Sequence, residues 1–186
     1  MNEYYNGLPR YVKIKNEKFI INTDYRIFVE FEKEMQGIDT KKAILNALSR
    51  FYPAFSIICN KNLLKEAVDK FIWFYKCGKV DINQKSSNKG QKKEQIFNYS
   101  YDADLIYGTY MIYARIDLNK YVHWWKFKAI WNSLPSDCEF NKIKSYRAYT
   151  GKDEDILELK EFYKLPPSEK EKIQEIKAQQ IFEALK

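Results

Sequence analysis

The strongest hydrophobic pattern of the chain lies between residues 116 and 134. One set of large apolar residues recurs at intervals of three and four positions: Trp124, Phe127, Trp131 and Leu134. This spacing is typical of one face of a helix. A second set with helical spacing marks another face: Leu118, Val122, Trp125 and Ala129. Because a helix that is apolar on two faces must be packed from both sides, we predict that this segment is the central helix of the protein.

The residues that flank this segment predict where the helix begins and ends. Asp117 has a short side-chain acceptor that can bond the free N–H groups of a first turn. Pro135 disfavours a helical conformation at the residue before it and therefore ends the helix. Each large aromatic side chain buries roughly 150–250 Å². We therefore assign five residues of the segment to the structural core: Trp124, Trp125, Phe127, Trp131 and Leu134.

The same spacing predicts helices over much of the remaining chain. The predicted ranges are 24–35, 40–51, 62–77, 102–114, 138–149 and 154–163. Near the start, Tyr11–Lys15 alternates apolar and basic residues and Phe19–Ile21 follows a polar turn at Asn16-Glu17, a pattern that predicts a β-hairpin. The predicted fold class is therefore mainly α: a multi-helix bundle with a small N-terminal β-hairpin and a C-terminal amphipathic helix.

Two changes of composition divide the predicted bundle. Residues 83–95 are polar, and Gln84–Lys93 has no apolar residue and a positive net charge, so we predict a mobile loop there. Near the end, Pro166-Pro167 precedes Ser168 and Glu171, which match the capping box of a new helix. We therefore predict a helical domain over residues 1–150 and a C-terminal helical arm over residues 151–186.

The predicted arm is a candidate for binding a protein partner. Its apolar residues are Ile173, Ile176, Ile181, Phe182 and Leu185, together with Ala178. Such a helix can fold back onto its own domain or dock on another chain, including a second copy. Both alternatives remain open from the sequence.

Charge and cysteine content narrow the function classes. The net charge of +7 suggests nucleic-acid binding through the 84–93 loop and surface lysines, but the lysines are spread along the chain rather than gathered on one face.

Three widely spaced cysteines, Cys59, Cys77 and Cys138, favour buried reduced thiols. No signal peptide and no apolar run long enough to cross a membrane is present. These features are typical of a cytoplasmic protein, with nucleic acid a less favoured partner.

Motifs for catalysis, cofactors and metals are missing from the sequence. His123 is the only histidine, and no Cys-x-x-Cys pair or nucleophile lies at a useful spacing beside it. We therefore expect its ring to pack or to bond a backbone group. The carboxylates Asp102 and Asp104 are explained by the start of a helix, where negative charge is stabilised. We expect no enzyme activity, no cofactor and no metal site.

Several segments resemble a family of phage proteins, the gene product fifteen family of long-tailed phages. The most specific segments are Ile116-Asp117-Leu118 and His123-Trp124-Trp125-Lys126-Phe127. Further matches follow in the same order along the chain: Leu8-Pro9, Ile21–Arg26, Trp73-Phe74, Asp102–Tyr113 and Arg147. The resemblance covers about residues 8 to 150. Because Arg26 and Arg147 match positions of the family pattern, we take them as candidates for partner binding or for internal salt bridges.

The resemblance implies a role in building the phage tail. The family is encoded beside the gene of the tape-measure protein, so the resemblance implies a tail assembly chaperone that binds the tape-measure protein before the tail tube polymerises. Such a protein acts in the host bacterial cytoplasm and has the capacity for self-association through its arm. Nucleic-acid binding is the alternative function.

Overall fold

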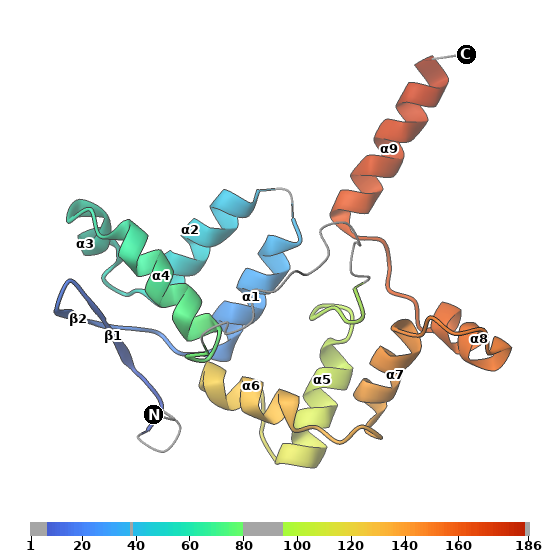
Figure 1. The fold of residues 1–186 in the computed structure, drawn as a ribbon, viewed down its shortest axis with the longest axis horizontal. Coiled ribbons are helices and arrows are strands. Elements are labelled where there is room, and N and C mark those ends of the chain that lie inside the picture. Colours follow the sequence, from blue (N-terminus) through green and yellow to red (C-terminus); the bar gives the residue numbers. More distant parts are fainter. Residues whose placement is uncertain (1–6, 38, 80–94, 185–186) are drawn as a thin grey trace.

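The computed structural model describes residues 7–37, 39–79 and 95–184. It confirms the predicted fold class, since the described chain is mainly helical with one N-terminal two-stranded antiparallel sheet (Figure 1). The elements are β1 (Tyr11–Ile14), β2 (Glu17–Ile20), α1 (Tyr25–Met35), α2 (Thr40–Phe51), α3 (Phe55–Asn60), α4 (Leu64–Tyr75), α5 (Ala103–Thr109), the π-helical turn η2 (Tyr110–Ala114), α6 (Trp124–Asn132), α7 (Glu139–Arg147), α8 (Glu154–Phe162) and α9 (Glu169–Ala184). The predicted loop 83–95 lies outside the described residues, apart from Gln95.

The hairpin turns one residue earlier than predicted. Tyr11 pairs with Ile20 and Ile14 with Glu17, so Lys15 and Asn16 form the turn. Both have positive φ, 44° and 67°, as the two-residue hairpin turn that matches strand twist requires. Asparagine tolerates this left-handed conformation better than most residues.

Helices α1, α2 and α4 form one side of the bundle, as their short links predict. Asp24 and Asp39 cap α1 and α2 by accepting hydrogen bonds from Arg26 N and Lys42 N. Between α2 and α4 lies the short helix α3, which the sequence pattern did not predict. Pro53 ends α2 but permits a new helical turn two residues later.

The central helix is shorter than predicted, because it begins at Trp124 and not after Asp117. Residues 118–123 are not helical, although Leu118 and Val122 are buried. Here the chain pairs with the start of α1: Trp124 N donates to Thr23 O over 2.7 Å, and Tyr25 N donates to Val122 O over 2.9 Å. The first N–H of each helix therefore has a carbonyl partner from the other segment, which satisfies donors that have no intrahelical partner.

His123 caps α6 with its side chain. Its Nδ1 accepts a hydrogen bond from Trp125 N at 3.1 Å, and its Nε2 lies 3.0 Å from Pro9 O. Because Nδ1 accepts, the ring proton is on Nε2, which donates to the Pro9 carbonyl. The expected backbone bond of this histidine is thus present twice, and the bonds join the N-terminal segment to the start of α6.

The two indoles at the start of α6 hold the end of α4. Trp124 Nε1 donates to Tyr75 O over 2.9 Å, and Trp125 Nε1 donates to Phe74 O over 2.8 Å. Both carbonyls belong to the last turn of α4. The carbonyl of Phe74 also accepts from Cys77 N, whereas the end of a helix leaves its last carbonyls without the usual intrahelical donors. Gly78 follows with φ +71°, and a Cβ there would lie 2.9 Å from Trp125 Cη2. Only glycine lets the chain leave α4 beneath this ring.

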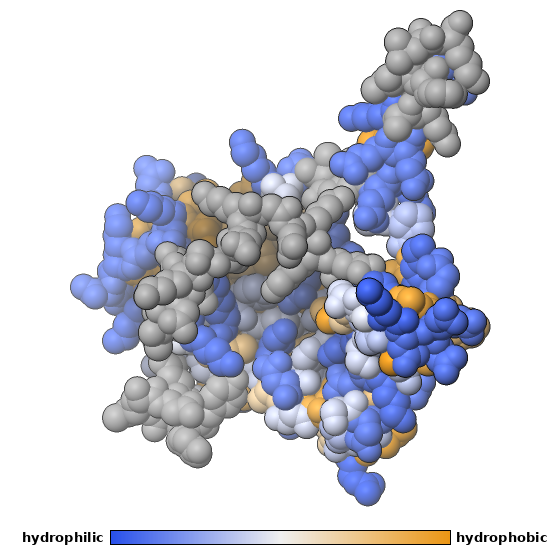
Figure 2. All heavy atoms as spheres, turned by 45° about the vertical axis from the view of Figure 1, so that its right-hand side comes forward, coloured by the Kyte–Doolittle hydropathy of each residue, from blue (hydrophilic) through white to orange (hydrophobic). Residues whose placement is uncertain are grey.

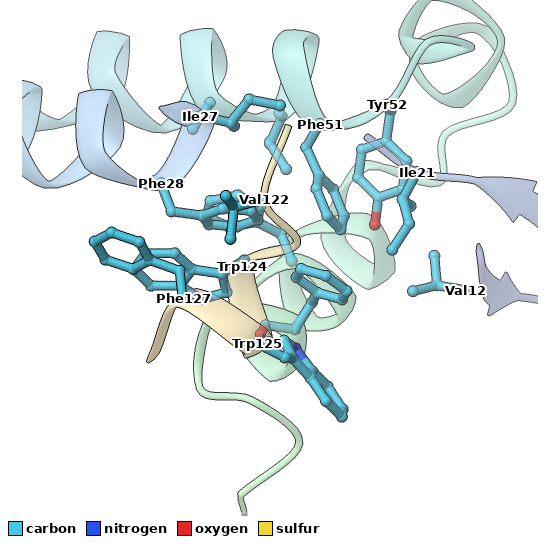
Figure 3. Packing of buried hydrophobic residues seen from close by; sticks show 14 of the residues in the cluster. Val12, Ile21, Ile27, Phe28, Phe51, Tyr52, Val122, Trp124, Trp125 and Phe127 are labelled. Atoms are coloured by element: carbon cyan, nitrogen blue, oxygen red, sulfur yellow. Dashed lines mark hydrogen bonds between the residues drawn. The ribbon is translucent and has the colours of Figure 1, made fainter. Parts of the chain in front are cut away.

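Stacked aromatic rings fill the space between α1, α4 and α6 (Figure 3). Phe28 lies 4.8 Å from Trp124 between ring centroids, and Phe127 lies 4.8 Å from Tyr110. Tyr110 also donates its hydroxyl proton to Phe127 O. The structure buries Trp124, Trp125, Phe127 and Trp131. The remaining assigned core residue, Leu134, lies beyond the end of α6 and is only half-buried against the cluster.

The C-terminal helices pack less and less against the core along the chain. Helix α7 packs on α5 and on α8, whereas α8 has no buried residue. Helix α9 extends away from the other helices (Figure 1). Its start has the predicted capping box, since Glu171 accepts from Ser168 N and Glu171 N donates to Ser168 Oγ.

We predict that the capping role of His123 makes folding stability depend on pH. Burial lowers the pKa of His123, whereas in the unfolded chain it keeps its ordinary value of about 6.5. The unfolded state therefore binds more protons below that pH, so stability is fully present above about pH 6.5 and falls as the pH decreases. Urea unfolding at about pH 7.5, 6.5 and 5.5 measures this loss.

The control variant is His123→Asn, which keeps an N-cap acceptor but does not titrate. Its free energy of unfolding should change less over the same pH range. Since the chain has no other histidine, an equal slope in both proteins would contradict the prediction.

Candidate protein-binding groove

A π-helical turn shapes the surface beside α6. Helix α5 continues into η2, and η2 is followed by Arg115, which has φ 53° and ψ 38°. Ile116 N then donates to Tyr110 O over 3.2 Å and closes the turn. A left-handed arginine is unfavourable relative to glycine, and π-helical turns often occur at functional sites. Because strained backbone is common at functional sites, the surface that this turn forms with α6 is a candidate site.

One depression on this surface is apolar. It has a volume of about 600 Å³ and lies between η2 and the C-terminal half of α6. Its lining residues are Tyr113, Ala114, Arg115, Ile116, Lys126, Ile130, Ser133, Leu134 and Pro135. Tyr113 is 49% exposed, and Ile130 and Leu134 are half-buried. We call this depression the apolar groove.

A second depression continues from the first and is basic. It has a volume of about 570 Å³ and shares Arg115, Ile116 and Lys126 with the apolar groove. Its other lining residues are Leu8, Arg10, Asp117, Lys120, Tyr121, Val122 and His123. We call it the basic cleft. Four cations therefore face one carboxylate.

The cations of the basic cleft are available for a ligand. Arg10, Arg115, Lys120 and Lys126 are exposed, and none of them forms an ion pair with the described residues. The carboxylate of Asp117 is already engaged, since it accepts from Asn119 N and from the Tyr107 hydroxyl. Cations gathered in a cleft with low-dielectric walls produce a positive potential that attracts anionic groups.

Other exposed apolar side chains are more scattered. Figure 2 shows a mainly hydrophilic face on which apolar residues form small patches. On η2, Ile112 is 71% exposed, and on α8, Phe162 is 79% exposed. Single exposed apolar residues are normal on a protein surface. The apolar groove differs from them because its apolar residues surround one concavity.

Arg147, a candidate for partner binding, lies inside the protein. Its guanidinium donates to both oxygens of Asp102, at 2.8 and 2.9 Å, and to the carbonyls of Tyr163 and Ile96. The side chains of Arg147 and Asp102 are 5% and 1% exposed. The carboxylate of Asp102 is thus not the free helix cap that the sequence suggested. The pair joins α5, α7 and the segment that follows α8.

Arg26, the second arginine candidate, is exposed but not free. Its Nε and NH2 groups both donate to the carboxylate of Asp24, and this ion pair raises the pKa of Arg26. Its side chain remains 54% exposed on the first turn of α1. Arg26 lines neither depression.

The candidate residues of the arm are described in part. Ile173 is half-buried and Ile176 is 53% exposed on α9. The side chains of Ile181 and Phe182 and the whole of Leu185 lie outside the described part of the chain. These residues lie on a different part of the chain from the apolar groove.

From the sequence, we expect a partner groove along helices 24–77 or along the central helix, but the residues of the groove and the cleft are not singled out. The hydrophobic pattern assigned 116–134 entirely to a buried helix and so gave no role to Lys120, Lys126 or Ile130. One available signal was the run Tyr110-Met111-Ile112-Tyr113. Four consecutive apolar residues exceed what one helix face can bury, and the last three of them are indeed exposed.

Two kinds of site are not found in the described ranges. Within residues 7–37, 39–79 and 95–184, no group of three or more His, Cys, Asp or Glu side chains could hold a metal ion. Over the same residues, no helix is long and apolar enough to cross a membrane.

We predict that the buried pair of Arg147 and Asp102 is critical for stability. Arg147→Met should lower the free energy of unfolding by roughly 3–5 kcal/mol, because it leaves a buried carboxylate unpaired. The double variant Arg147→Met/Asp102→Leu should recover part of this loss, since both charges are removed. Urea unfolding measures both changes. The control is Lys61→Met, which breaks an exposed pair with Glu17 and should cost less than about 1 kcal/mol.

We predict that the side chain of Arg115 does not contribute to the stability of the fold. Arg115→Gly should keep or raise the free energy of unfolding, by up to about 1 kcal/mol, because glycine adopts φ +53° without strain. Lys126→Gly, in the neighbouring helix α6, should instead cost about 1 kcal/mol. A large loss of stability for Arg115→Gly in thermal or urea unfolding would show that the arginine holds the fold together.

Comparison with known proteins identifies the family of the chain. Residues 5–179 match the model of the family described as Bacteriophage Gp15 protein. No curated protein and no solved structure matches the chain significantly. The match covers the β-hairpin, helices α1 to α8 and most of α9. Since it spans most of the sequence, the chain belongs to the bacteriophage Gp15 family.

Proposed function

We propose that this phage protein is a tail morphogenesis factor: a tail assembly chaperone that binds the tape-measure protein and keeps it soluble before the tail tube polymerises. The observation that carries the proposal is the apolar groove beside the basic cleft. It offers a protein partner a concave apolar surface with charges at its edge. Helix-in-groove binding is a common mode of protein recognition.

The physical need for such a factor follows from the nature of its partner. A tape-measure protein is a long helical polymer, and its apolar stripes would aggregate while they are exposed. A small helical protein can cover these stripes and release them when the tube encloses the polymer. Release requires modest affinity for each copy. A half-open groove with a few apolar side chains suits that requirement better than a deep pocket.

The C-terminal arm is proposed as a second contact. Ile176 on α9 is exposed, and α9 extends away from the other helices (Figure 1). A helix in that position can reach another chain, either the partner or a second copy of this protein. Arg26, which is exposed on α1, is proposed as a further polar contact.

The proposed activity is binding without catalysis, in the cytoplasm of the host bacterium. It requires no cofactor and no metal. Nucleic-acid binding through the 84–93 loop and surface lysines remains the alternative function. Its signature would be an affinity that falls steeply with added salt.

Co-expression with the tape-measure protein of the same phage tests the proposal. We expect the wild-type chain to raise the soluble fraction of the tape-measure protein, measured by sedimentation and gel densitometry. Tyr113→Ser should reduce this rescue, because Tyr113 lines the apolar groove and is half-exposed. Ile176→Glu should reduce it if the arm contacts the partner.

The matched control is Leu45→Ser, which changes an equally exposed apolar residue on α2, away from the groove. It should leave the rescue unchanged. Circular dichroism checks that every variant is folded. A folded wild-type chain that rescues no tape-measure protein would refute the chaperone function.

A further inference from the structure

The apolar groove and the basic cleft together point to a specific ligand. We infer that they form one docking site for an amphipathic helix that carries acidic residues next to one end of its apolar stripe. This inference rests on the proposed function and specifies the chemistry of the partner segment. It does not depend on the identity of the protein that supplies the segment.

The two depressions are continuous. Arg115, Ile116 and Lys126 line both of them. The basic cleft reaches His123 at the start of α6, and the apolar groove reaches Leu134 beyond its end. Helix α6 has nine residues and is therefore about 14 Å long at 1.5 Å per residue. A ligand helix of about three to four turns would cover both depressions.

Apolar and charged side chains are separated within the docking site. Within the apolar groove, the charged residues are Arg115 and Lys126, at the edge shared with the cleft. The basic cleft adds Arg10 and Lys120. A helix whose stripe covers Tyr113 and Ile130 therefore meets cations toward one end only. Acidic residues at that end complement the cations, and basic residues there would be repelled.

Nucleic acid fits the side chains of this site less well than a protein helix does. A nucleic-acid strand carries phosphates at regular intervals along its whole length. The apolar groove offers such a strand mainly aliphatic side chains and the exposed ring of Tyr113, and the basic cleft adds one more exposed ring, that of Tyr121. Strand-binding grooves instead combine cations along the backbone with several stacking aromatics. The observed pattern favours a protein helix.

Synthetic peptides test the inference directly. The probe is a fluorescent helical peptide of about 14 residues with a leucine stripe and three glutamates at one end of it. A second peptide replaces the glutamates by glutamine, and a third replaces the leucines by serine. Fluorescence polarisation with the full chain gives each Kd at about 50 mM and about 300 mM NaCl. The glutamate peptide should bind about tenfold more tightly than the glutamine peptide at low salt, and this ratio should shrink at high salt.

Variants of the full chain locate the site. The double variant Arg115→Asn/Lys126→Gln should bring the glutamate peptide to the affinity of the glutamine peptide, while asparagine tolerates the left-handed backbone. Tyr113→Ser should weaken both peptides. The matched control is Lys41→Gln/Lys142→Gln, which removes two exposed lysines from α2 and α7. It should leave every Kd unchanged.

Specific outcomes would overturn the inference. If the glutamate and glutamine peptides bound with equal affinity, the ligand would not need acidic residues. If the serine peptide bound as tightly as the glutamate peptide, the ligand would not need an apolar stripe. A single-stranded oligonucleotide that binds more tightly and loses affinity in Arg115→Asn/Lys126→Gln would assign the surface to nucleic acid. The chain could also be found to self-associate. If Tyr113→Ser abolished this self-association and the glutamate peptide did not affect it, the surface would be assigned to a second copy of the chain.

The experiments distinguish a failure of the chaperone function from a failure of the inferred ligand chemistry. Rescue of the tape-measure protein without binding of the glutamate peptide would overturn only the ligand chemistry. Peptide binding without rescue would leave the docking site in place and refute the chaperone function.

Discussion

The fold depends on how the start of α6 is held between α1 and α4. Two indole N–H groups from consecutive residues, Trp124 and Trp125, satisfy the terminal carbonyls of α4. On the other side, the first N–H groups of α1 and α6 bond to carbonyls from each other's flanking segments. Three helix ends meet at one point, and each provides the partners that another lacks. Because buried polar groups without partners destabilise a protein, no one of the three ends can move alone.

This arrangement leaves one side of α6 at the surface of the protein. The side with Trp124 and Phe127 is completely buried, whereas Lys126 and Ile130 face the surface next to η2 (Figure 3 shows the buried side). The groove is therefore built on a helix whose position is fixed by the core. A rigid support of this kind reduces the entropy lost when a ligand binds. The strained residue Arg115 adds charge at the middle of this surface.

The sequence predicted burial better than conformation. Leu118 and Val122 have helical spacing and are buried, yet Leu118 lies in a turn and Val122 in the non-helical residues that pair with the start of α1. Asp24, Asp39 and the Ser168–Glu171 capping box were predictable, since each bond is local. The pairing of Arg147 with Asp102 spans 45 positions, and no local pattern contains it. The same holds for the groove, which residues 113–116 and 126–135 form only after the chain folds.

The Arg147 anchor also determines how far the C-terminal helix can reach. It fixes the chain at Tyr163, and residues 164–168 connect this point to α9. Five residues extend at most about 18 Å, and the sixteen residues of α9 add roughly 24 Å. The tip of the helix therefore lies at most roughly 40 Å from Tyr163. Under the proposed function, this reach would let one copy contact an elongated polymer at two places, several helical turns apart.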